Sequence, residues 1–262
     1  MAPYAISIDN RSDIKRSYAL FAEPPTIKHN GGSAIKVVTR IISSARGVAS
    51  PHGQANFTLS KKLYARCGVY DVEVDPSPDD QNRKRVGVAL RSSTSDLSHS
   101  DSSSGTPAFT ENNPAPSGAV GCFCIQTGGD FSVKEAKLNQ FVVGFCSSTR
   151  QSIGPYATFV PQPSEEYQIA PSKGFYVVVG NFNPYDLADM RLKDSMSACY
   201  VDFASLETDS VTLVHHSNGT LVGQVVTDGE MRPVPVPSPN TPVFARAFAR
   251  EEFRVGTATV TA

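Results

Sequence analysis

The chain has 262 residues, of which 40% are hydrophobic and 19% charged, and its formal net charge is −1. This balance is ordinary for a soluble globular protein and disfavours a strongly basic face for nucleic acid. No apolar run approaches the ~18 residues that a membrane helix needs. We therefore expect neither a nucleic-acid partner nor insertion into a membrane.

Short apolar runs typical of β-strands recur along the whole chain. The first covers residues 4–10, with Tyr4, Ile6 and Ile8 on one face, and it ends at a turn-like Asn-Arg-Ser-Asp. A second run covers residues 17–21 and stops before two prolines, so we predict a hairpin of these two strands. Further predicted strands cover residues 35–42, 56–59, 69–74, 86–90, 120–127, 141–146, 156–160, 175–182, 198–203, 211–215, 221–226 and 251–261.

Two segments of unusual composition interrupt this pattern. Residues 91–117 are rich in Ser, Asp, Asn and Pro, which predicts a mobile loop or a lid. Residues 233–242 hold five prolines and should be extended and rigid along an edge. The one helical candidate covers residues 184–192. We predict an all-β fold: one domain over residues 1–262, a mostly antiparallel β-sandwich or barrel of about twelve to fifteen strands with long loops.

The cysteines and glycosylation sequons bear on the compartment. Five cysteines leave at least one unpaired within a monomer, and we expect most to be small buried residues in strands. The alternative is one or two disulfides in a secreted protein, for which Cys122 or Cys124 with Cys146 are candidates. Sequons begin at Asn10, Asn56 and Asn218. No signal peptide is visible at the N-terminus, so cytoplasm and secretory lumen both stay open.

No recognised catalytic, metal-binding or phosphate-binding motif occurs. HExxH, GxSxG, GxxxxGK[ST] and paired CxxC motifs are all absent. No second cluster of Cys and His stands at ligand spacing, so we expect no metal and no cofactor. These absences favour a function that lies in the shape of an apolar cavity or surface.

Several polar side chains are nevertheless candidates for catalysis. Tyr64 and Arg66 share a face if their segment is extended, and together they would bind an anionic or quinone-like oxygen. In the alternative, Arg66 is a surface ion-pair partner. His215 and His216 are adjacent and face opposite sides of a strand, so one should line the interior. That histidine is either a general acid or base, or hydrogen-bonded near the strand end. We assign Tyr64, Arg66 and His216 to catalysis.

Three further residues are assigned to substrate binding. Tyr200 shares a face with Asp202, opposite an apolar face, and looks toward solvent or a polar pocket. Asn181 ends a strongly apolar strand and presents its amide at a cavity mouth or in a turn. Tyr176 lies on that same strand. The expected ligand is a small hydrophobic or polycyclic substrate; the oligomeric state is open, with a homodimer among the options.

Several local phrases together resemble a known family. They are YAISIDN at 4–10, LFAEPP at 20–25, YARCG at 64–68, FYVVVGN at 175–181, VDF at 201–203 and HSNGT at 216–220. The chain resembles small all-β microbial proteins, and within them it is similar to the fungal cofactor-free hetero-Diels–Alderases of tropolonic sesquiterpenoid biosynthesis. None of these phrases is a catalytic signature, so the resemblance carries no catalytic residue to this chain.

The resemblance implies a pericyclic enzyme of fungal secondary metabolism. The reaction would join a tropolone ortho-quinone methide, formed by loss of water from a hydroxymethyl tropolone, to an alkene of a humulene-type ring, giving a dihydropyran. Such a reaction needs a cavity that orients two reactants and no reactive group. Two other functions stay open: a non-catalytic carbohydrate- or lipid-binding β-sandwich module, and a structural or defence-related secreted protein.

Overall fold

The computed structural model describes residues 2–31, 34–69, 83–86, 95–99, 107–109, 119–149, 153–184, 186–194, 197–227 and 230–233. Within these residues 18 strands form three sheets, so the predicted all-β fold is confirmed. The strand number exceeds the predicted twelve to fifteen. Most strand pairs are antiparallel, also as predicted; β1 with β16 and β8 with β10 are parallel.

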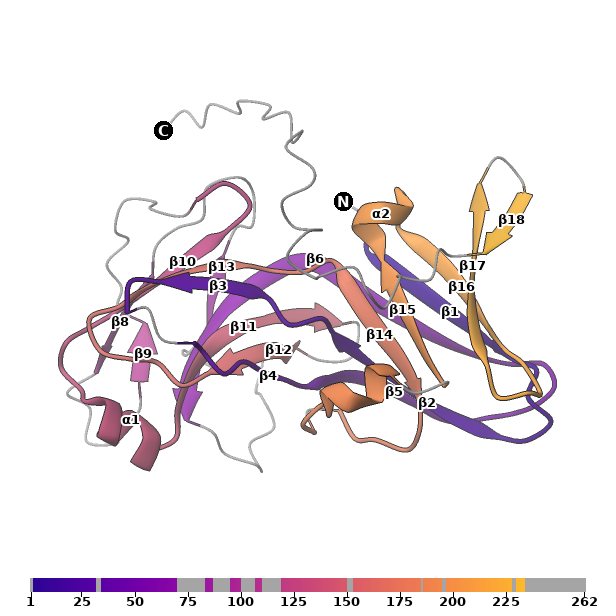
Figure 1. The fold of residues 1–262 in the computed structure, drawn as a ribbon, viewed down its shortest axis with the longest axis horizontal. Helices are drawn as coiled ribbons and strands as arrows, with labels where there is room; N and C mark the ends of the chain where they lie inside the picture. The colour runs from indigo at the N-terminus through magenta and orange to yellow at the C-terminus, as the bar shows by residue number, and fades with distance from the viewer. Residues whose placement is uncertain are drawn as a thin grey trace.

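The largest sheet has nine strands and runs along the length of the molecule (Figure 1). Its order is β18 (Glu230–Pro233), β17 (Leu221–Thr227), β16 (Ser210–His215), β1 (Tyr4–Asn10), β6 (Gly53–Val69), β11 (Phe141–Thr149), β12 (Ile153–Phe159) and β4 (Val38–Thr39), with β7 (Arg83–Val86) paired to β6. The long strand β6 pairs with β1 through its first residues and with β11 and β7 through its later ones. This strand therefore joins the two ends of the sheet.

Two smaller sheets complete the fold. A four-stranded antiparallel sheet has the order β15 (Ala198–Asp202), β14 (Gly174–Val179), β2 (Arg16–Ala22), β5 (Ile41–Val48). A five-stranded sheet has the order β3 (Thr26–His29), β13 (Glu166–Ala170), β10 (Phe123–Thr127), β8 (Ser95–His99), β9 (Pro107–Phe109). The chain passes from β2 in the four-stranded sheet to β3 in the five-stranded one through Pro24 and Pro25. Because proline lacks an N–H for a ladder hydrogen bond, this step ends one sheet and begins the other.

The predicted hairpin of β1 and β2 is wrong. β1 lies between β16 and β6, whereas β2 lies between β14 and β5 in another sheet. The connection is held by Asn10, whose side-chain nitrogen lies 3.1, 2.9 and 3.1 Å from the carbonyl oxygens of Ile14, Val48 and Ala49. Two consecutive apolar strands occur both in a hairpin and in two facing sheets, so their sequence pattern does not distinguish these arrangements.

Aromatic side chains fill the space between the sheets. Phe123 on β10, Phe145 on β11, Tyr156 on β12 and Phe175 on β14 form a chain of neighbouring rings with centroid distances of 5.7, 5.7 and 6.0 Å. All four are buried, within one cluster that draws on all three sheets. The expected apolar hollow therefore does not lie where these rings pack, because close packing leaves no room for a ligand there.

The strand β2 is buried on both faces. Tyr18 and Leu20 point into the main core, whereas Ala19 and Phe21 belong to a second apolar cluster on the opposite face. That second cluster is covered by the 3-10 helix η1 (Met190–Asp194) and the residues before it. The predicted helix over 184–192 is thus reduced to this short turn. A run of consecutive apolar residues is typical of such a doubly covered strand.

Two short α-helices were not predicted. α1 (Val133–Leu138) begins with a capping box, in which Ser132 Oγ accepts from the Glu135 N–H and Glu135 Oε2 accepts from the Ser132 N–H. α2 (Phe203–Leu206) is capped by Asp202, whose carboxylate accepts from the Ala204 N–H. The Ser-x-x-Glu pattern of a capping box is visible in the sequence. It was missed because the helix is only six residues long.

The predicted loop over 91–117 lies mostly outside the described residues. Its described parts, however, are the strands β8 and β9, which extend the five-stranded sheet from β10. Strands were not predicted at these two positions, and the mobile loop or lid over the segment stays a prediction. Main-chain hydrogen bonds to a sheet edge do not require apolar side chains. Of the proline-rich segment over 233–242, only Pro233, the last residue of β18, is described. Residues 70–74 and 87–90 and the predicted strand over 251–261 lie outside the described residues.

None of the five cysteines is joined to another in a disulfide. Cys67, Cys124 and Cys146 are buried, which confirms the prediction for most of them. The sequon asparagines differ in exposure: Asn56 and Asn218 are exposed, whereas Asn10 is fully buried with its amide in use. A glycan cannot attach to Asn10 in the folded chain. No helix in the described part of the chain is long and apolar enough to cross a membrane.

Candidate functional site

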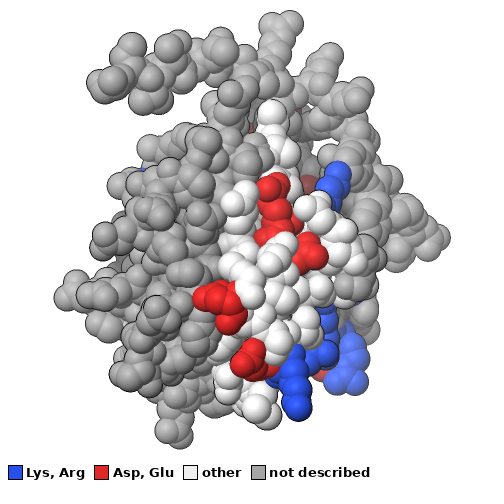
Figure 2. All heavy atoms as spheres, turned by 90° about the vertical axis from the view of Figure 1, so that its left-hand side faces the viewer, with Lys and Arg blue, Asp and Glu red and all other residues white. Residues whose placement is uncertain are grey.

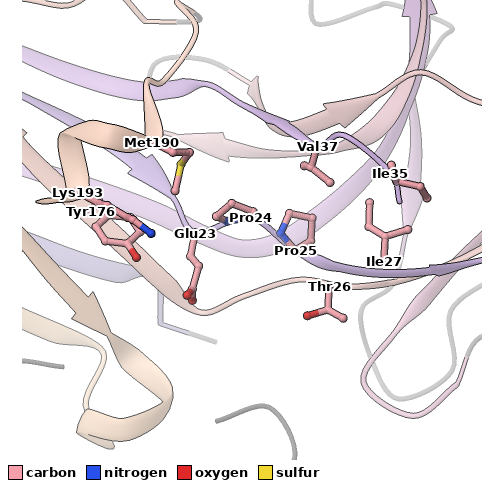
Figure 3. Close-up of a pocket in the computed structure, with 10 residues that line it drawn as sticks. All are labelled: Glu23, Pro24, Pro25, Thr26, Ile27, Ile35, Val37, Tyr176, Met190 and Lys193. Atoms are coloured by element: carbon pink, nitrogen blue, oxygen red, sulfur yellow. The ribbon is translucent and has the colours of Figure 1, made fainter. Parts of the chain in front are cut away.

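A pocket of about 310 Å³ lies where β2 leads into β3 (Figure 3). This volume is at the lower end of the range for small-ligand sites, about 300–1,000 Å³. Most of its lining is apolar. The residues that line it are Glu23, Pro24, Pro25, Thr26, Ile27, Ile35, Val37, Tyr176, Met190 and Lys193.

Four parts of the chain build this pocket. The two prolines carry the chain from β2 to β3, and the segment before β4 supplies Ile35 and Val37. Figure 3 shows Ile27, Ile35 and Val37 grouped at one end, with the prolines between them and the other end. At that other end β14 supplies Tyr176, and η1 supplies Met190 and Lys193. The pocket therefore has an apolar end and a mixed end.

Three polar side chains form a hydrogen-bonded group at the mixed end, here named the Glu23 corner (Glu23, Ser172 and Tyr200). The Tyr200 hydroxyl donates to Glu23 Oε2 over 2.8 Å, and the Ser172 hydroxyl donates to the same oxygen over 2.6 Å. The Gly174 N–H donates to Ser172 Oγ over 2.9 Å, which leaves the serine proton for Glu23. One carboxylate oxygen of Glu23 thus has two donors from the protein.

Gly174 makes this corner geometrically possible. Its carbonyl also accepts a hydrogen bond from the Glu23 N–H over 2.9 Å, which fixes the backbone of Glu23 against β14. A Cβ atom added at Gly174 would overlap the Tyr200 hydroxyl and lie 2.7 Å from Glu23 Oε2. A side chain at this position would therefore have to displace the ends of Tyr200 and Glu23, which glycine avoids.

Burial and charge fix the protonation of Tyr200. Burial first, and then the neighbouring Glu23 carboxylate, raise the pKa of the Tyr200 phenol far above its ordinary value. The phenol therefore stays protonated and acts as a donor across the whole neutral range. Its ring lies 4.8 Å from that of Tyr176, which in turn stacks on Phe21 at 5.2 Å.

The structure brings together two of the predicted substrate-binding residues. Tyr176 lines the pocket, and the ring of Tyr200 on the neighbouring strand β15 contacts the ring of Tyr176. Asn181 is exposed beyond the end of β14 and does not line the pocket.

The three predicted catalytic residues do not form one group. Tyr64 and Arg66 lie half-buried on one face of β6. His216 follows β16, whose last residue His215 lies beside Asn10, which itself lies opposite Gly53 at the start of β6. At the usual rise per strand residue, Tyr64 is roughly 35 Å further along β6 from that point. These residues therefore cannot act on the same small substrate.

The interior histidine is His215, not His216. His215 is 1% exposed, and its Nδ1 lies 3.0 Å from the Tyr18 hydroxyl. Burial, followed by the charge of Arg16, lowers the pKa of His215, although a hydrogen bond with the Gly219 backbone opposes this. The interpretation as a hydrogen-bonded histidine near a strand end is confirmed for His215.

Sequence reasoning missed Glu23, Ser172 and Gly174. A glutamate between an apolar strand and two prolines is a visible signal, because the prolines turn the chain and leave the carboxylate at a sheet edge. Its two donors, Ser172 and Tyr200, lie 149 and 177 residues further along the sequence. No local pattern predicts that meeting.

A second, shallower hollow lies over α1 and is lined by Val133, Lys134, Lys137 and Leu138. Figure 2 shows this end of the molecule, where acidic side chains cross the described surface and basic ones gather at its lower edge. Leu138 is 75% exposed there. The polar side chains that line this hollow, Lys134 and Lys137, are exposed cations of one helix, so the pocket at the Glu23 corner is the better candidate.

The pocket offers an apolar surface together with a carboxylate and an ammonium at one end. Among the described residues, Glu23 and Lys193 form no ion pair with each other or with another side chain. No three His, Cys, Asp or Glu side chains in the described part of the chain gather as metal ligands. Such a site can bind and orient a mostly apolar molecule that carries one polar end. No family model, curated protein or solved structure matches this chain.

Proposed function

We propose that this chain binds a small, mostly apolar substrate in the pocket and orients it for a cycloaddition that uses no cofactor. The reaction is the intermolecular hetero-Diels–Alder addition of a tropolone quinone methide to a humulene-type alkene, as the family resemblance implies. The observation that carries the proposal is the division of the pocket into an apolar end and a mixed end.

The two ends suit the two reactants. Ile27, Ile35 and Val37 offer hydrocarbon contacts to the alkene, and Tyr176 and Lys193 lie where an oxygenated ring would sit. Electron density moves toward the quinone methide oxygen during the addition, and a nearby ammonium stabilises that charge. Holding two reactants in one orientation contributes about 7–11 kcal/mol in favourable cases. At about 310 Å³ the pocket encloses one reactant, and the second approaches at its mouth.

The test is product formation by the purified chain from a tropolone alcohol and humulenol. We expect a faster reaction and a different stereochemical ratio from those of the enzyme-free mixture. Ile35→Trp, which fills the apolar end, should lower the rate at least about tenfold because the alkene loses its binding surface.

The matched control is Leu138→Trp, which adds the same side chain at the exposed end of α1, and its rate should stay unchanged. Product ratio and stereochemistry equal to those without protein would overturn the proposal. So would equal rates in the two tryptophan variants.

The apolar lining also favours a lipid over a carbohydrate, because few hydrogen-bonding groups face the pocket. The second candidate function is therefore a non-catalytic lipid-binding module. Saturable binding of humulenol, lost in Ile35→Trp but without any acceleration of the addition, would identify that function instead.

A further inference from the structure

We infer that Glu23 is the specificity-determining residue of this pocket and accepts a hydrogen bond from a hydroxyl group of the bound molecule. The pocket would then select apolar alcohols over methyl ethers and carboxylic acids of the same skeleton. Ser172 and Tyr200 are positioning residues that hold the carboxylate. The inference rests on the proposed binding of an apolar substrate in the pocket.

The two oxygens of Glu23 differ in what they contact. Oε2 accepts from both Tyr200 and Ser172, at 2.8 and 2.6 Å. No hydrogen bond to Oε1 is present among the described residues, and Glu23 lines the pocket. A carboxylate has about four acceptor positions, so Oε1 is available to a donor on the ligand.

The carboxylate is held before any ligand arrives. Two donors on one oxygen fix the position of the group, and Ser172 is itself fixed by the Gly174 N–H at 2.9 Å. The backbone of Glu23 is tied to the same strand through its N–H to the Gly174 carbonyl, at 2.9 Å. An acceptor that is already in place binds its ligand at a lower entropic cost.

The chemistry of Oε1 sets the order of ligands. A hydroxyl group donates to the carboxylate in a charge-assisted hydrogen bond, whereas a methyl ether has no proton to donate. A ligand carboxylate is repelled by the like charge of Glu23. Lys193 offsets only part of this repulsion, because its side chain is exposed and water weakens its charge interactions.

The experiment is calorimetric titration of the full chain at pH 7.5 with farnesol, farnesyl methyl ether and farnesoic acid. These three molecules share one fifteen-carbon skeleton and differ only at the polar end. We expect farnesol to bind at least about tenfold more tightly than the ether, as a hydrogen bond to a charged group implies. Farnesoic acid should bind most weakly.

The decisive variant is Glu23→Gln. Tyr200 and Ser172 still donate to the amide oxygen, so the amide nitrogen replaces Oε1 and presents a donor in place of an acceptor. We expect the preference for farnesol over the ether to fall to about twofold or less. Asp13→Asn, an equal loss of charge at an exposed position before β2, should keep the tenfold preference.

The possible results separate the two proposals. Binding of farnesol and its ether with equal affinity by the unmodified chain would overturn the role of Glu23 and leave the pocket as a binding site. An unchanged preference in Glu23→Gln would do the same. If none of the three molecules binds, or if Ile35→Trp binds them unchanged, both proposals fail. The ligand order of the unmodified chain is informative even if a variant does not fold.

Discussion

Two polar clusters lie at opposite ends of β2, and they differ in how completely the protein uses their hydrogen-bonding groups. The Asn10 cluster (Asn10, Ser12, Tyr18 and His215) lies near the first residues of the strand and is buried. The Glu23 corner follows the last residue of the strand and is half-buried. One cluster is closed within the protein, and the other is open to a pocket.

In the Asn10 cluster both the amide oxygen and the amide nitrogen of Asn10 have hydrogen-bond partners within the protein. Asn10 Oδ1 accepts from both the N–H and the hydroxyl of Ser12, at 3.1 and 2.6 Å. Its amide nitrogen reaches three backbone carbonyl oxygens, and His215 pairs with Tyr18. Such a cluster stabilises the fold because burial makes any lost partner costly.

In the Glu23 corner, Oε1 of the pocket-lining Glu23 accepts no hydrogen bond from the described residues. Buried polar groups alone therefore do not mark a candidate binding site in this protein. A polar group whose position is fixed and whose capacity is not used is the better indicator. Four predictions test this distinction.

Asn10→Ala should lower the free energy of unfolding by about 3 kcal/mol, because it leaves several buried backbone groups without partners. Urea unfolding measures this change. Asn56→Ala is the control, since Asn56 is exposed on the neighbouring strand with one side-chain hydrogen bond from Ser7, and it should cost less than about 0.5 kcal/mol. Equal losses in the two variants would contradict the structural role of the Asn10 cluster.

The same substitution in the two clusters should have unequal effects. Tyr18→Phe removes the partner of a buried imidazole nitrogen and should cost about 2 kcal/mol of unfolding free energy. Tyr200→Phe should cost about 1 kcal/mol or less, because water reaches a half-buried carboxylate and replaces the donor. Chemical unfolding of both variants checks the difference. A larger loss in Tyr200→Phe would mean that the Glu23 corner is the structural cluster.

Gly174→Ala should cost about 1–2 kcal/mol, as expected for overpacking, and should displace Tyr200 from Glu23. The double variant with Tyr200→Phe should cost less than the sum of the two single changes, because the hydroxyl that the new methyl group meets is gone. Unfolding free energies of the four proteins give this cycle. Strictly additive losses would show that the loss in Gly174→Ala does not come from a contact of the new methyl group with the Tyr200 hydroxyl.

The smallest expected effect is on the pH dependence of stability. Because burial lowers the pKa of His215, this imidazole binds a proton more weakly in the folded chain than in the unfolded chain. Stability from this group is complete above the ordinary imidazole pKa of about 6.5 and decreases as the pH falls below it. His215→Gln should reduce this decrease relative to His52→Gln, an exposed control, in unfolding experiments from pH 8 to pH 5. A slope equal in both variants would contradict the assignment.

Several parts of the candidate site were predictable from single segments. Alternation along its strand indicates a polar face for Tyr200, and Tyr176 lies on a strongly apolar strand. They meet because β14 and β15 pair with Tyr176 opposite Tyr200. Glu23 was visible before its two prolines, yet nothing local indicated that its donors would be Ser172 and Tyr200. His216 was chosen over its neighbour, since alternation along a strand says which residues face opposite ways and not which way is inward.

The all-β class, most of the strands and the burial of most cysteines are predictable from the amino-acid sequence, because they follow from the period of apolar residues along a short stretch. The identity of neighbouring strands, the separation of β1 and β2 into different sheets and the contact of Glu23 with Tyr200 depend on the tertiary fold. The physical reason is that strand pairing joins main-chain groups that every residue carries, so distant partners leave no local mark in the sequence.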